Sequence, residues 1–283
     1  MTGGAEPVAL RVMTLSDIPD GLRLSGAAGW NQRSEDWRFL LERNPGRFVV
    51  AVREGRVIGS GGAVCYGTAL AWVCMILVDP SERGHGIGSR IVSGVLDRLS
   101  DMRSVGLDAT PFGLGVYARL GFVETSRLLR LEAPPTSGEE DESPVRPLAP
   151  GDFEAVLARD RVVFGADRGD LLRAAAARAA AFVAARDATI VGYCFGRDGA
   201  RSRQIGPVVA DDIDIASSLV VTSLCAGSGE PVVVDVPADR GDWLAMLDEF
   251  GFVEKRPLVR MFRGAPTPGL PERVWAIFGP EFG

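Results

Sequence analysis

The sequence predicts an α/β protein of two similar domains, each with a mixed, mostly antiparallel sheet of the α+β type flanked by helices. An internal repeat is the first reason: LGFVE at Leu120–Glu124 matches FGFVE at Phe250–Glu254, and VGLDATP at Val105–Pro111 matches VVVDVP at Val232–Pro237. The copies lie about 130 and 127 residues apart, which is too long for a solenoid and suits a duplicated domain. The second reason is that the order of expected elements recurs in both halves.

The first half alternates short strands and helices. Period-two runs and glycine turns predict strands at residues 8–14, 47–53, 56–66, 69–78 and 105–109, with further strands up to 131. Helical periodicity predicts helices at residues 15–27, 34–43, 87–99 and 111–120. This order predicts a mixed sheet with helices on its faces.

The second half repeats this order. Helices are expected at residues 152–159, 170–185, 213–224 and 243–250. Strands are expected at residues 189–196, 203–209 and 231–236, with a last strand that runs into Met261. The helix at 170–185 is predicted from its many alanines, because alanine has the highest helix propensity.

A proline-rich acidic stretch divides the two halves. Residues 132–144 read EAPPTSGEEDESP, which has no apolar period and cannot bury enough surface to fold alone. We therefore predict a first domain over residues 1–132, a linker over 133–144, a second domain over 145–264 and a tail over 265–283. The tail ends in VWAIFGPEFG, which is apolar for a terminus, so we expect it to dock on the protein.

The composition is that of a globular protein and excludes several partners. Of 283 residues, 46% are hydrophobic and 24% are charged. A net charge of −6 and a pI near 5.1 argue against general binding to nucleic acid or to an anionic membrane. The four cysteines form no CxxC pair, so we expect buried thiols and neither disulfides nor a metal site. No leader or membrane-spanning segment is recognisable, and we expect a cytoplasmic protein.

The segment ILVDPSERGHGIGSR, at Ile76–Arg90, is the most informative. An apolar strand stops at a proline, and an arginine and alternating glycines then open an amphipathic helix. Backbone N–H groups at such a helix start favour a bound diphosphate. A dinucleotide-binding GxGxxG motif does not fit, since Ser89 takes the third glycine's place, and a P-loop would need a lysine. The alternative is an ordinary tight turn that needs glycine only for its positive φ.

Two segments together resemble the GNAT N-acetyltransferase superfamily. The first is the R-x-x-G-x-G loop that starts at Arg83, and the second is LDATPFGLGVYARLGF at Leu107–Phe122. The resemblance covers most of residues 8–131 and implies acetyl-CoA as co-substrate. By this resemblance, Ile76, Leu77 and Val78 contact the pantetheine arm and thioester. The residues around the diphosphate are then Arg83, Gly84, His85, Gly86, Ile87, Gly88 and Ser89.

Tyr117 matches the position of the family's general acid, which protonates the departing thiolate; its alternative role is packing at a helix end. Asp108 is a candidate to orient or deprotonate the amine. Because Asp235 holds the matching place in the second copy, a structural hydrogen-bonding role for Asp108 is equally well supported. The family's usual glutamate base is missing from the strand, where Cys74 and Met75 stand. Bulk water is the alternative proton acceptor.

Residues between the first two expected helices form a wall of the acceptor pocket in this superfamily. Trp30 is a candidate to stack on the acceptor, and Asn31 and Gln32 are candidates to hydrogen-bond to it. A core tryptophan with a polar helix cap is the alternative. A covalent route through Cys74 is disfavoured, because a thiol in apolar surroundings has a raised pKa and is inert.

The second copy lacks the first copy's chemistry. It reads IGPVVADDIDIASS in place of the glycine loop, and the position that matches Tyr117 is Leu247. Its acidic side chains would repel a diphosphate. We therefore predict a degenerate second domain, one active site per chain, and a second domain that closes the acceptor side or forms a homodimer face. The carboxylate of Gly283 is a further candidate base.

These observations predict an acetyl-CoA-dependent N-acetyltransferase that acts on a primary amine of a small molecule by direct attack in a ternary complex. Tyr117 and Asp108 are the expected catalytic residues, and no metal is implied. A non-catalytic acyl-CoA sensor or scaffold is the first alternative, and a protein lysine acetyltransferase with an open acceptor groove is the second.

Overall fold

The computed structural model describes residues 7–135, 144–227, 229–267 and 269–283, so most of the predicted linker lies outside the described residues. The strands of the first half are β1 (Ala9–Val12), β2 (Val49–Arg53), β3 (Arg56–Tyr66), β4 (Leu70–Val78), β5 (Ser104–Ala109) and β6 (Val123–Ala133). Its helices are η1 (Leu15–Asp17), α1 (Ile18–Ala27), α2 (Ser34–Arg43), η2 (Pro80–Glu82), α3 (Ile87–Leu96) and α4 (Leu114–Arg119). These elements follow the predicted order.

The second half has the same succession of elements. Its strands are β7 (Val145–Pro147), β8 (Phe182–Arg186), β9 (Thr189–Asp198), β10 (Arg203–Ala210), β11 (Val232–Pro237), β12 (Val253–Arg263) and β13 (Val274–Ala276). Its helices are η3 (Pro150–Asp152), α5 (Phe153–Phe164), α6 (Gly169–Ala176), α7 (Ile213–Cys225), α8 (Gly241–Glu249) and η4 (Pro271–Arg273). The prediction of a mixed sheet flanked by helices is confirmed.

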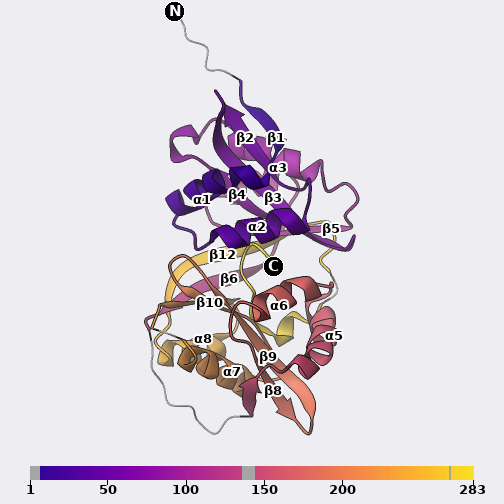
Figure 1. The fold of residues 1–283 in the computed structure, drawn as a ribbon, viewed down its shortest axis with the longest axis vertical. Helices are drawn as coiled ribbons and strands as arrows, with labels where there is room; N and C mark the ends of the chain where they lie inside the picture. The colour runs from indigo at the N-terminus through magenta and orange to yellow at the C-terminus, as the bar shows by residue number, and fades with distance from the viewer. Residues whose placement is uncertain (1–6, 136–143, 228, 268) are drawn as a thin grey trace, which may run out of the picture.

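The strands of both halves form one continuous sheet, in the order β1-β2-β3-β4-β5-β12-β6-β11-β10-β9-β8-β7, with β13 paired to β10. Among the strand pairs that the structure describes, only β4–β5 and β10–β11 are parallel, one in each half. Figure 1 shows the two halves joined where β12 and β6 run side by side.

The last strand of each half is exchanged between the halves. Strand β12 lies between β5 and β6 of the first half, and β6 pairs in turn with β11 of the second half. The two halves are therefore distinct along the chain but are interleaved in the sheet, so neither completes its sheet alone.

Two reciprocal ion pairs lock this exchange. Asp108 on β5 accepts two hydrogen bonds from Arg260 on β12, at 2.9 and 2.8 Å. Asp235 on β11 accepts two from Arg130 on β6, at 2.8 and 2.7 Å. Paired N–H···O bonds of this kind are the strongest geometry that arginine offers to a carboxylate. The two carboxylates hold matching places in the repeat, as do the two arginines.

Helices cover both faces of the sheet, because successive side chains of a strand point to opposite faces. On one face, α1 and α2 of the first half share a single core with α5 and α6 of the second half. On the opposite face, α3 packs on the first half, and α7 and α8 pack on the second half. The largest core thus belongs to both halves.

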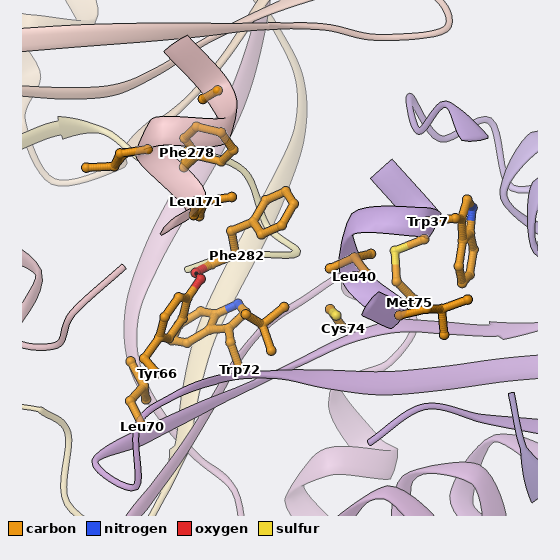
Figure 2. Packing of buried hydrophobic residues seen from close by; sticks show 14 of the residues in the cluster. Trp37, Leu40, Tyr66, Leu70, Trp72, Cys74, Met75, Leu171, Phe278 and Phe282 are labelled. Atoms are coloured by element: carbon orange, nitrogen blue, oxygen red, sulfur yellow. Dashed lines mark hydrogen bonds between the residues drawn. The ribbon is translucent and has the colours of Figure 1, made fainter. Parts of the chain in front are cut away.

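The C-terminal tail is part of that shared core. Phe278 and Phe282 are buried, and their rings pack edge to face with centroids 5.1 Å apart. The Tyr66 hydroxyl donates to the Phe282 carbonyl at 2.6 Å, and the Trp72 indole N–H donates to the Pro280 carbonyl at 2.9 Å. Figure 2 shows Phe282 lying over Tyr66 and Trp72, and Figure 1 places the C-terminus between the two halves.

The helix predicted at residues 170–185 is present only as far as Ala176, and the rest of that prediction is wrong. Helix α6 ends at Ala176, and residues 182–186 form strand β8. The side chain of Val183 is fully buried in the sheet and pairs with Tyr193 of β9, so tertiary burial overrides the helix propensity of the alanines. The short strands β7 and β13 were not predicted, because three residues carry too little pattern.

We expect the substitution Phe282→Ala to lower the free energy of unfolding by about 3–5 kcal/mol, because it leaves a cavity in the shared core. Urea denaturation followed by tryptophan fluorescence measures this loss. The matched control is Phe112→Ala, since the side chain of Phe112 is 85% exposed and should contribute little. Equal denaturation midpoints for the two variants would show that the tail does not stabilise the fold.

Candidate active site

The sheet opens beside the glycine loop. Strands β4 and β5 pair only from Leu70 with Ser104 to Trp72 with Gly106, although β4 continues to Val78. A bulge turns β4 away from β5 at this point. Met75 has a positive φ of 57°, and the register of β4 with β3 shifts there. The part of β4 beyond the paired residues includes Ile76–Val78, which are predicted to contact the pantetheine arm and thioester.

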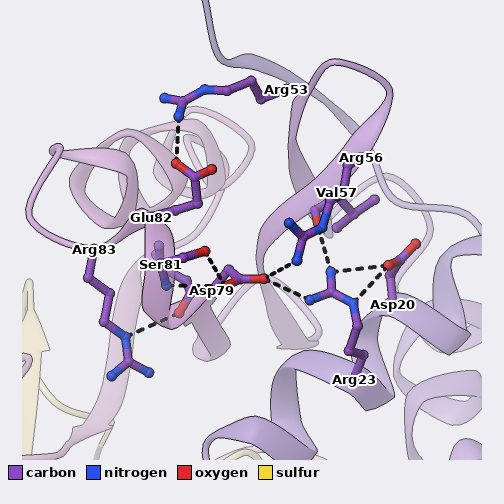
Figure 3. Close-up of polar contacts among 10 residues, drawn as sticks. Asp20, Arg23, Arg53, Arg56, Val57, Asp79, Ser81, Glu82 and Arg83 are labelled. Atoms are coloured by element: carbon purple, nitrogen blue, oxygen red, sulfur yellow. Dashed lines mark hydrogen bonds and ion pairs between the residues drawn. The ribbon is translucent and has the colours of Figure 1, made fainter. Parts of the chain in front are cut away.

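A cluster of arginines fixes the end of β4. Asp79 accepts hydrogen bonds from Arg23 on α1 and from Arg56 on β3, both at 2.8 Å. Its other oxygen accepts from the backbone and hydroxyl of Ser81, and these bonds and charges lower the pKa of the Asp79 carboxyl. Figure 3 shows this cluster directly before the loop. The loop thus starts from a rigid point.

The glycines of the loop border open space. Gly84 and Gly86 have φ of 83° and 76°, and no atom lies within 4 Å of where a Cβ would stand on either. The first hydrogen bond of α3 runs from the Arg90 N–H to the Gly86 carbonyl, so the preceding N–H groups have no partner inside the helix. This arrangement fits a bound diphosphate.

The remaining loop residues surround the same helix start. The Arg83 side chain donates to the Val78 carbonyl at 3.2 Å, and the ring of His85 lies 3.3 Å from the Glu82 carbonyl. His85 is exposed, so its ring faces solvent and its backbone is the part that belongs to the loop. Ile87 is buried in the core, where it anchors α3.

A cavity of about 80 Å³ lies where β4 and β5 part. Five residues singled out in the sequence line it: Trp30, Gln32, Ile76, Asp108 and Tyr117. The rest of its lining is Val73, Cys74, Met75, Thr110, Arg130, Arg256, Leu258, Pro280 and Glu281. Side chains from both halves and from the tail therefore enclose one space.

Tyr117, the predicted general acid, lines this cavity. Tyr117 lies on α4, and its ring packs on Phe122. Gly113 leaves room for the Tyr117 ring, since a Cβ there would come within 2.8 Å of it. Within the described residues, its hydroxyl has no hydrogen-bond partner. Burial raises the pKa of the Tyr117 phenol, so it stays protonated at neutral pH.

The geometry separates the two roles left open for Asp108. Its carboxylate is buried, and both oxygens accept hydrogen bonds from Arg260. Burial raises its pKa, and the guanidinium opposes that rise. This supports the structural role, since a carboxylate held at both oxygens is a poor proton acceptor.

The three acceptor-wall candidates have different surroundings. Trp30 and Gln32 line the cavity, whereas Asn31 does not. The Asn31 amide donates to the Ser202 carbonyl at 2.8 Å and accepts from the backbone N–H of Arg201 at 2.8 Å. The expected acceptor contact of Asn31 is replaced by a connection between the two halves.

The tail supplies a residue that sequence reasoning missed. Glu281 accepts hydrogen bonds from the Gln32 amide at 2.9 Å and from Arg197 at 2.7 Å. Burial alone would raise the pKa of the Glu281 carboxyl, but the charge of Arg197 outweighs burial and lowers that pKa below its usual value. Gly283, proposed as a base, lies elsewhere: its carbonyl accepts from Arg168, and it lines a different cavity of about 520 Å³. The sequence held one sign of this role: Glu281 is the only acidic residue in the otherwise apolar ending VWAIFGPEFG.

Arg256 was also missed, because one arginine on the predicted last strand of the second half carries no motif. Cys74 lines the cavity too, but burial raises its pKa well above the usual value, which disfavours a thiolate nucleophile.

Among the described residues there is no cluster of three or more His, Cys, Asp or Glu side chains that could hold a metal. No described helix has the length and hydropathy needed to cross a membrane.

A sheet that parts beside a glycine loop at a helix start, with a phenol in the opening, is the geometry expected of a group-transfer enzyme that uses a phosphorylated carrier. Comparison with known proteins gives the particular family. Models described as an acetyltransferase (GNAT) domain match residues 44–124 and, separately, residues 156–279. The chain belongs to the GNAT superfamily, carries two GNAT domains in tandem and is a GNAT-type N-acyltransferase. Membership implies an acyl-CoA co-substrate.

Relatives share this arrangement over nearly their whole length. The chain is 27% identical over 245 residues to the uncharacterized N-acetyltransferase YitH of Bacillus subtilis, covering 82% of this chain and 83% of that protein. It is 28% identical to the holothin acyltransferase of a Pseudoalteromonas species, covering 91% and 88%. A putative acetyltransferase from Pyrococcus horikoshii has the same fold, with a TM-score of 0.85, 22% identity and coverage of 100% and 99%.

The loop geometry predicts that Gly86→Ala weakens CoA binding at least about tenfold, because a Cβ keeps the backbone away from the diphosphate. Calorimetric titration with CoA measures the affinity. Gly67→Ala is the matched control: Gly67 also has a positive φ, of 60°, with no atom within 4 Å of its would-be Cβ, but it lies in the β3–β4 turn. Equal affinities for the two variants would contradict this placement of the diphosphate.

The raised pKa of Tyr117 predicts the alkaline side of the rate profile. A general acid works while protonated, so its activity is lost as pH rises through its pKa. Because this pKa lies above the usual value of 10.0, Tyr117 should cause no fall in kcat between pH values of about 7 and 10. Thiol release measured across this range tests the point. A fall in the wild type that Tyr117→Phe lacks would contradict it.

Proposed function

We propose that the enzyme transfers an acetyl group from acetyl-CoA to a primary amine of a small molecule, by direct attack in a ternary complex. The cavity between β4 and β5 supports this most strongly. Tyr117, Trp30 and Gln32 all line it. In this proposal the thioester lies toward Tyr117, and the acceptor amine lies toward Trp30 and Gln32.

In this reaction, the amine nitrogen attacks the thioester carbonyl carbon, a C–N bond forms and the C–S bond breaks. Tyr117 gives its proton to the departing sulfur. The amine loses its proton to water, because the carboxylates that line the cavity are each held by an arginine: Asp108 by Arg260, and Glu281 by Arg197.

The second domain, in this proposal, is a wall rather than a second catalyst. Asp212 caps α7 and accepts the Ile215 N–H at 2.9 Å, so its own carboxylate occupies the helix start that would receive a diphosphate. Leu247, at the place that matches Tyr117, is fully buried in the core. One active site per chain follows.

A small-molecule acceptor is favoured over a protein lysine. The cavity is closed by Arg256 and Leu258 of the second half and by Pro280 and Glu281 of the tail. A peptide backbone would have to displace the tail, which hydrogen bonds from Tyr66 and Trp72 hold in place.

The test is to incubate the purified protein with acetyl-CoA and amino acids, polyamines, amino sugars or aryl amines, and to follow release of the free CoA thiol. We expect amine-dependent release, with kcat lowered about 10²- to 10⁴-fold by Tyr117→Phe. Tyr193→Phe is the matched control, because its buried hydroxyl donates to Asp160 outside the cavity. Tight CoA binding without release for any amine would instead support the acyl-CoA sensor.

A further inference from the structure

Two buried polar atoms, on residues that line the cavity between β4 and β5, lack the partners that buried groups normally have. They are the Gln32 side-chain oxygen and the Arg256 Nε, and neither is hydrogen-bonded within the described part of the chain. Buried polar atoms are nearly always bonded, so each such atom calls for an explanation. Both residues line the cavity that holds Tyr117.

The orientation of the Gln32 amide is fixed by its neighbour. Its nitrogen must face Glu281, because only an N–H can donate to that carboxylate, and the two atoms are 2.9 Å apart. The amide oxygen is therefore the atom left over. An N–H of an acceptor amine would satisfy it.

Arg256 stands out from the other arginines around the site. Arg130, Arg197 and Arg260 are each paired with a carboxylate. Arg256 forms no hydrogen bond or ion pair with any residue that the structure describes. It lies directly opposite Arg130 in the register of β12 with β6, and like charges in that position are destabilising.

The fold itself does not need this arginine. In the internal repeat, Arg260 corresponds to Arg130, 130 residues earlier. By the same offset, the residue of the first half that corresponds to Arg256 is Ser126. Burial and the charge of Arg130 lower the pKa of Arg256, so keeping this side chain charged costs free energy. No described residue offsets that cost by direct contact with the guanidinium.

We infer that Arg256 binds an anionic group of the acceptor, so that the substrate is a small amine that also carries an oxyanion such as a carboxylate. The amine lies toward Gln32 and the oxyanion toward Arg256. Guanidinium suits this task because its planar N–H donors match an oxyanion. This inference rests on the proposed function and narrows its substrate class.

A matched series of compounds tests the inference by calorimetric binding to the complex of full-length enzyme and CoA, where no turnover occurs. Ethylamine is compared with β-alanine, taurine and 2-aminoethylphosphonate, and phenethylamine with phenylalanine. We expect the compounds that carry an oxyanion to bind more tightly than the matched amines that lack one, and the affinities for the carboxylate, sulfonate and phosphonate to differ according to how well Arg256 binds each group.

Variants connect the preference to the residue. Arg256→Met should weaken binding of the compounds that carry an oxyanion about 10- to 100-fold and leave binding of the amines without one unchanged, whereas Arg256→Lys should restore part of the loss. Arg263→Met is the control, because Arg263 is exposed at the end of the same strand and has no ion pair within the described residues. CoA affinity should be the same in all four proteins.

Several results would overturn the assignment. These are no preference for anionic members in the wild type, a preference retained by Arg256→Met, or a loss of CoA affinity in that variant, which would place Arg256 on the co-substrate. Turnover is scored separately. Anion-selective binding without thiol release would reject the proposed acetyl transfer while leaving the role of Arg256 intact.

Discussion

The reciprocal ion pairs Asp108–Arg260 and Asp235–Arg130 are the interactions on which the rest of the structure depends. Each joins a strand of one half to the exchanged strand of the other, in the middle of the continuous sheet. Both carboxylates are buried, and removing one partner of a buried pair costs about 3–5 kcal/mol, because it leaves a charge uncompensated. The exchange is thereby specified in one register, and strands β12 and β6 are held beside the opening of β4.

The position of the acceptor cavity follows from this exchange. Because β12 replaces a strand of the first half, Arg256 and Leu258 of the second half become walls of the first half's active site. The tail then occupies the seam between the halves, where Trp72 and Tyr66 hold its carbonyls. In the proposed reaction, a second domain without a glycine loop thus still shapes the acceptor side of the cavity.

Charge is distributed unevenly around the cavity. The acidic groups Asp108 and Glu281 are paired with arginines and serve mainly to hold strands and tail in place. Among the described cavity-lining residues, the Tyr117 hydroxyl, the Arg256 Nε and the Gln32 side-chain oxygen have no hydrogen-bond partner. In the proposed reaction, the chemistry depends on these unpaired groups, which stand within an ion-paired frame.

The amino-acid sequence by itself determined the duplicated fold, the loop at residues 83–89 and Tyr117, because these rest on local patterns: period-two strands, glycines at a helix start and a tyrosine at fixed spacing. Tertiary structure alone decided which residues meet across the halves. Asn31 joins the two halves, Asp108 is bound by Arg260, and Glu281 and Arg256 enter the cavity. The physical reason is that strand exchange and tail docking bring together residues more than 150 positions apart, which no local pattern encodes.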